Sequence, residues 1–197
     1  MSIAKVIKIS NITILLSIFM LSAIIYQSVS SIYEYVEKEN LNYKSIMLAG
    51  ELRHSSRELT ENFRLYIMTG NDEYNKAYWN IAKERSGIIP RSHDKAVSPG
   101  EKTELSTVIE KIIPHEYFYM VKRALMLSDD LIHFENDAMN IIKKHDRTEQ
   151  DVLKAKELAY SPYYILKTHE IMSIIAQFYT EINNKSKKSV GDLKNVI

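Results

Sequence analysis

Five residues carry the chemistry that this sequence offers most clearly, the recognition of a small polar or anionic molecule. Aromatic residues concentrate around one predicted helix–helix turn, and two arginines lie in the same region. A guanidinium binds a carboxylate through paired N–H donors, and aromatic rings attract cations. A helical bundle that leaves a ring-lined gap there would hold a small ligand. The candidate ligand-binding residues are Arg64, Tyr66, Tyr78, Trp79 and Arg85.

A structural interpretation competes with this one. The same rings would then form an apolar cap at one end of a helical bundle, and Arg64 would pair with a neighbouring acidic side chain. The residue types alone leave both interpretations open.

Other kinds of chemistry are not indicated. The 5 glycines are dispersed and form no phosphate-binding loop. The 6 histidines contain no His-x-x-x-His pair and there is no cysteine, so we expect no metal site. No nucleophile has an evident base beside it, so we expect neither an enzyme nor a cofactor. With 26 basic and 25 acidic residues, the chain has no positive field that would attract nucleic acid.

The elements that must position these residues begin with an apolar helix. Residues 9–33 carry no charge, and the apolar centre over residues 12–25 suits the hydrocarbon core of a bilayer. Lys5 and Lys8 precede this run and Glu34 follows it. Because basic flanks stay in the cytoplasm, we expect a single-pass protein with its N-terminus inside and its C-terminal domain in the periplasm or outside the cell.

The organisation expected from this anchor has four parts. Residues 1–8 form a cytoplasmic tip, residues 9–29 a transmembrane helix, residues 30–190 an extracytoplasmic domain, and residues 191–197 a juxtamembrane end without a second span. A cleaved signal peptide, with Ser28-Val29-Ser30 as its cleavage site, is the alternative.

The rest of the chain has helical periodicity. Apolar residues recur every three or four positions over residues 45–66, 120–141 and 164–182. Residues 87–100, with two prolines and two glycines, form the predicted loop. The expected fold class is all-α, with an N-terminal transmembrane helix followed by an elongated up-down-up-down four-helix bundle. Its predicted core includes Leu52, Leu59, Phe63, Leu131, Phe134, Ile171, Ile175 and Phe178.

Three stretches between residues 55 and 178 follow a pattern known from receptor domains. They are Leu59-Thr60, Arg64-x-Tyr66 and Thr69-Gly70 followed by Tyr78 and Trp79; Ala124, Ser128-Asp129-x-Leu131 and Glu135; and Tyr163, Lys167 and Ile171-Met172. The sequence is similar to the extracytoplasmic four-helix-bundle sensor region of bacterial methyl-accepting chemotaxis proteins and related transmembrane signal-transduction receptors. Receptors of this kind control chemotaxis, and related bundles precede histidine kinases and nucleotide cyclases.

The resemblance implies a membrane-anchored sensory, ligand-binding module of such a receptor, located in the bacterial inner (cytoplasmic) membrane and working as a homodimer. The pattern departs after residue 178, where neither a second span nor an output domain follows, so we expect a sensor that lacks its output domain, either as a fragment of a longer receptor or as a truncated, anchored sensor. The alternative is a membrane-anchored helical bundle with a structural or interaction role and no sensing function.

Overall fold

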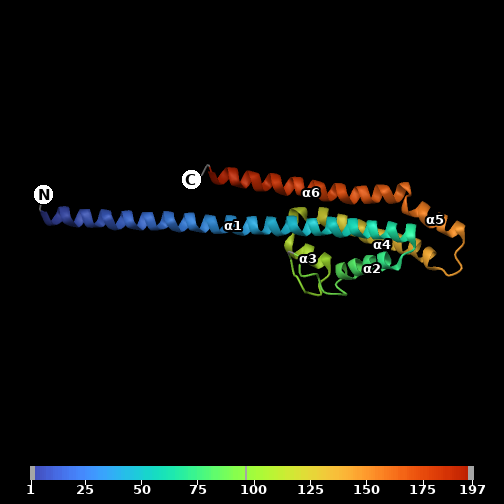
Figure 1. Ribbon diagram of the computed structural model, residues 1–197. Coiled ribbons are helices and arrows are strands. Elements are labelled where there is room, and N and C mark those ends of the chain that lie inside the picture. The colour runs from blue at the N-terminus through green and yellow to red at the C-terminus, as the bar shows by residue number, and fades with distance from the viewer. Residues whose placement is uncertain (1–2, 96, 195–197) are drawn as a thin grey trace. The chain divides into compact units, whose positions relative to one another are not determined.

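The computed structural model describes residues 3–95 and 97–194, and all regular structure within these ranges is helical (Figure 1). The chain divides into two compact units, one up to Asn40 and one from Leu41 onward, which we call the N-terminal and C-terminal units. The expectation of an all-α protein is therefore confirmed. The helices are α1 (Ile3–Thr69), α2 (Asp72–Arg85), α3 (Leu105–Ile112), α4 (His115–Lys143), α5 (Glu149–Ala159) and α6 (Pro162–Lys194).

The N-terminal unit consists of the first part of α1. Among the described residues, this is the one helix that is long and apolar enough to cross a membrane. The apolar side chains of residues 12–25 are exposed, as expected for a surface that lipid would cover. The hydroxyls of Ser17 and Ser22 donate to the carbonyls of Thr13 and Ile18, both at 2.9 Å. These two hydroxyls are thereby satisfied within the helix, as an apolar surrounding requires.

Helix ends in the C-terminal unit follow from local sequence. Gly70 ends α1 with a φ of +68°, a conformation that costs glycine little, and its N–H donates to the carbonyl of Tyr66 at 2.7 Å. The side chain of Asn71 then accepts from the N–H of Glu73 at 3.0 Å and caps α2. A reciprocal capping box between Thr148 and Asp151 begins α5.

The core of the C-terminal unit lies between the long helices. α4 packs along α6, and α3 and α5 also contact α4. α1 joins them through Ser45, whose hydroxyl lies 3.3 Å from the carbonyl of Ile112, and through a bond of 3.2 Å from the Tyr179 hydroxyl to the carbonyl of Ile46. Phe134 is only half-buried, whereas the other seven residues of the predicted core are buried, namely Leu52, Leu59, Phe63, Leu131, Ile171, Ile175 and Phe178.

The connection between α2 and α3 is longer than the predicted loop, because α3 begins at Leu105. Two backbone hydrogen bonds join the two ends of the segment from Arg91 to Glu101. The N–H of Arg91 donates to the Glu101 carbonyl at 2.9 Å, and the N–H of Gly100 donates to the Arg91 carbonyl at 2.8 Å. The Arg91 side chain, 1% exposed, binds Glu51 of α1 at 2.6 Å. The middle of the connection is thus fixed to the bundle.

Candidate functional site

A buried carboxylate lies where three helices of the C-terminal unit meet. Glu135 of α4 is only 2% exposed. The hydroxyl of Tyr78, from α2, donates to its Oε2 at 2.5 Å, and the hydroxyl of Tyr164, from α6, donates to its Oε1. Both tyrosines are buried, so the three side chains form one closed polar group inside an apolar core.

Burial controls the ionisation of this group. Loss of water raises the pKa of Glu135 to about 7, although the tyrosine hydroxyls and the positive charges of Arg85 and Arg64 favour the carboxylate. Burial, followed by the charge of Glu135, raises the pKa of Tyr78 and of Tyr164, so both phenols keep their protons. At neutral pH the carboxyl group is therefore close to its midpoint of titration.

A second polar group joins α1, α2 and α4. Arg85, the last residue of α2, is 6% exposed and donates from Nη1 to Ser128 Oγ at 2.9 Å and from Nη2 to Asp129 Oδ1 at 2.8 Å. Ser128 Oγ lies 3.0 Å from Ser56 Oγ on α1. Burial is the main cause that lowers the pKa of Arg85 and raises that of Asp129. Arg85 is buried in this pair, whereas the Asp129 side chain is 50% exposed, so solvent weakens the attraction and the pair contributes less to stability than its short contact suggests.

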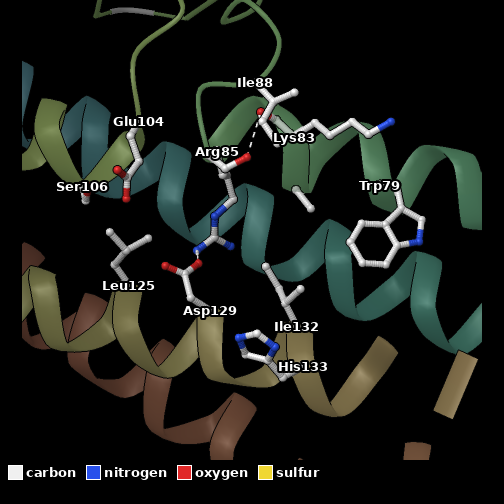
Figure 2. A pocket seen from close by; sticks show the side chains of 12 residues that line it. Trp79, Lys83, Arg85, Ile88, Glu104, Ser106, Leu125, Asp129, Ile132 and His133 are labelled. Atoms are coloured by element: carbon white, nitrogen blue, oxygen red, sulfur yellow. Dashed lines mark hydrogen bonds and ion pairs between the residues drawn. The ribbon is translucent and has the colours of Figure 1, made fainter. Parts of the chain in front are cut away.

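Beside this ion pair is a pocket of about 360 Å³ between α2, α4 and the start of α3 (Figure 2). Arg85 and Asp129 meet at its wall, and Glu104 lies at the same end. Trp79 lies at the other end in this view. The remaining wall is mainly apolar and includes Ala82, Ile88, Leu125 and Ile132.

A separate groove of about 510 Å³ runs between α1 and α6. Arg57 and Arg64 of α1 line it together with His169 of α6 and Tyr160. The Arg64 guanidinium lies 5.0 Å from the ring centre of Tyr160 and 5.4 Å from that of Tyr164. Among the described residues, no acidic side chain lines this groove.

The five predicted ligand-binding residues are therefore divided between several places. Trp79 and Arg85 line the same pocket, whereas Arg64 lines the groove on α1. Tyr78 binds Glu135 in the core, and Tyr66 is buried among core residues. In the described part of the chain, Arg64 contacts tyrosine rings and the Ala159 carbonyl, and no ion pair joins it to an acidic side chain.

Glu135 and Asp129 were not among the predicted site residues. Glu135 lies four residues after Leu131 and three before Ala138, so it falls on the apolar face of its helix. A charged residue in that register is rarely buried without a partner, and this signal is readable in the sequence. Asp129 carries no such signal, because only the fold shows that it faces Arg85.

Within the described residues, no cluster of three or more histidine, aspartate or glutamate side chains is arranged to hold a metal ion. Comparison of the chain with protein-family models, with curated proteins and with solved structures finds no match.

Proposed function

We propose that this chain is a membrane-anchored extracytoplasmic sensory module of a bacterial signal-transduction or chemotaxis receptor, and that it binds a small organic anion in the groove between α1 and α6. The observation that carries the proposal is the state of Arg64. Its guanidinium is half-buried and lies against two tyrosine rings, in a groove lined by two further basic side chains and, among the described residues, by no acid.

The groove has the chemistry that a carboxylate requires. The Nε of Arg64 is directed to the Ala159 carbonyl, with the two atoms 3.4 Å apart, which leaves its terminal N–H groups for a ligand. Two such groups bind the two oxygens of a carboxylate in a fixed plane, which the ammonium of a lysine cannot do. Arg57 adds a second guanidinium, and the Tyr160 ring adds an apolar surface.

Ligand binding at Arg64 has a direct electrostatic route into the core. Arg64 lies against the ring of Tyr164, and Tyr164 donates its hydroxyl to Glu135. Burial is the main cause that raises the pKa of Glu135, and the positive charge of Arg64 opposes this shift, so an anion that offsets the charge of Arg64 favours the protonated carboxyl. Signalling would then be a shift between two arrangements of packed helices that the ligand stabilises to different extents.

In this proposal the C-terminal unit is an elongated up-down-up-down four-helix bundle that works as a homodimer. The lengths of α1, α4 and α6 support three of its helices, and α2 followed by α3 supplies the fourth position. The N-terminal unit anchors it in the inner membrane.

Replacement of Arg64 by lysine is expected to weaken anion binding at least about tenfold, because a bidentate contact becomes a single point charge. A screen of organic acids, amino acids and amines on the full chain in detergent micelles measures this through the melting temperature, which a ligand of the folded state raises. Arg53→Lys is the matched control, because Arg53 also lies over a tyrosine ring, that of Tyr179, but does not line the groove. Anions whose stabilising effect survives Arg64→Ala would contradict the proposal.

The membrane topology gives an independent prediction. A reporter enzyme that is active only outside the cytoplasm, fused after Ile197, should be active in intact cells, because Lys5 and Lys8 retain the N-terminus inside. N-terminal sequencing of the purified protein should return the residues that precede the apolar run. Activity of a cytoplasmic reporter, or a mature N-terminus near Ser31, would contradict an uncleaved anchor.

The alternative is a bundle that binds a partner protein and no small molecule. It is favoured by exposed apolar side chains near the start of α6, Tyr160, Tyr163 and Leu166. A screen in which no compound raises the melting temperature would favour this alternative.

A further inference from the structure

We propose that the pocket between α2, α3 and α4 is a second ligand site, which binds an organic monocation, namely a primary amine with an apolar or aromatic body. Figure 2 shows the two acidic side chains, Glu104 and Asp129, at one end of this pocket and Trp79 at the other. The proposal concerns a different face of the bundle and different residues from the anion groove.

The pocket has the size and the walls of a small-molecule site. Its volume of about 360 Å³ lies within the range of roughly 300–1,000 Å³ that is usual for such sites. Leu125 at its base is buried, and Ala82, Ile88 and Ile132 extend the apolar wall. Trp79 is held in place by an edge contact with Tyr78, with ring centres 5.3 Å apart. The apolar part of a ligand that binds at this end would therefore be removed from water.

The acidic end carries more negative than positive charge. Of the two carboxylate oxygens of Asp129, only Oδ1 accepts a hydrogen bond from Arg85. In the described part of the chain, neither the second oxygen of Asp129 nor the carboxylate of Glu104 makes a hydrogen bond or ion pair. Figure 2 shows the Lys83 side chain extending away from both carboxylates. Two carboxylates against one guanidinium leave a single negative charge for a ligand to neutralise.

The pKa of Asp129 agrees with this excess of negative charge. Its pKa is raised mainly by burial, Arg85 opposes the shift, and the charge of Glu104 adds to it. The site is also built into the fold, because Arg85, which holds Asp129 in place at 2.8 Å, is nine-tenths buried. An ammonium group between the two carboxylates would supply the charge that the guanidinium does not.

The chain contains a single tryptophan, Trp79, and it lines this pocket, so tryptophan fluorescence reports ligand binding there. The full chain in detergent micelles is titrated with 2-phenylethylamine at pH 8, where the primary amine is a cation. The matched probes are 2-phenylethanol, which has the same body without charge, and 3-phenylpropionate, its anionic counterpart. We expect a saturable change with the amine, affinity at least about tenfold lower for the alcohol, and no saturation with the acid.

Variants of the two carboxylates assign the binding to this pocket. Glu104→Gln changes an exposed side chain without an ion-pair partner in the described chain, so the fold should persist while amine affinity falls at least about fivefold. Asp129→Asn should weaken binding further, and Asp130→Asn, which alters the neighbouring residue outside the pocket, should have no effect.

Two outcomes would overturn the proposal. Equal affinity for the amine and the alcohol would show that the pocket selects only apolar bodies. Amine binding that survives both Glu104→Gln and Asp129→Asn would place the cation elsewhere. Arg64→Ala should leave amine binding unchanged, so failure of the anion groove and failure of this pocket are distinguishable.

Discussion

Replacing Phe178 by alanine is expected to lower the free energy of unfolding of the C-terminal unit by about 3–5 kcal/mol. Phe178 is 0% exposed and lies on α6, facing α4. Its ring meets that of Tyr117 edge to face, with centres 5.6 Å apart, so the truncation removes an aromatic pair and leaves a cavity. Chemical denaturation of the full chain, followed by circular dichroism, measures the loss as a lower midpoint.

Leu166→Ala is the control for this measurement. Leu166 lies on the same helix and is 68% exposed, so its truncation should change the free energy of unfolding by less than about 0.5 kcal/mol. Phe134, which is half-buried, should give an intermediate loss. Equal midpoints for wild type and Phe178→Ala would mean that α6 does not pack on α4 as described.

The second large effect is a fall in stability as pH rises, caused by Glu135. Its pKa is about 7 in the folded state and about 4.5 in a solvated chain. Between these values the folded state binds the proton more tightly, so stability decreases with increasing pH. The loss is absent below about pH 4.5 and complete above about pH 7, and it amounts to roughly 3 kcal/mol.

Glu135→Gln isolates this contribution, because glutamine has the same shape and does not titrate. The difference in unfolding free energy between the variant and the wild type should grow by roughly 3 kcal/mol in favour of the variant between pH 4.5 and pH 8. Burial also raises the pKa of Glu51 and of Asp129, but both are present in each protein and cancel in the difference. A difference independent of pH would show that Glu135 is ionised throughout.

The helices were predictable because their signals are local. Apolar spacing, Gly70 as a stop signal and the capping residues of α5 depend on neighbours within about one turn. Phe134 was predicted as a core residue because it continues the apolar spacing of its helix. It is half-buried because one of its ring neighbours, Tyr164, is in the core, whereas the other, Tyr163, is itself 53% exposed.

The candidate sites were harder to predict because they depend on which helix faces which. Arg64 and Arg85 both lie near the first turn in the sequence, but one faces α6 and the other faces α4. Periodicity defines the face of a helix without naming the neighbour of that face. Trp79 and Arg85 line the same pocket because both belong to α2. The acidic residues of that pocket, Glu104 and Asp129, come from the start of α3 and from α4, which begin more than a dozen residues later in the sequence.

The contact between Arg91 and Glu51 changes the entropy of the long connection between α2 and α3. A free chain of this length would sample many conformations. Here the backbone N–H of Arg91 donates to the Glu101 carbonyl, and the Arg91 side chain binds Glu51 of α1. Opening the connection would leave one or both of these charges without its partner, at a cost of several kcal/mol. We therefore expect the segment to belong to the same cooperative folding unit as the part of α1 in the C-terminal unit, and not to open as an independent local fluctuation.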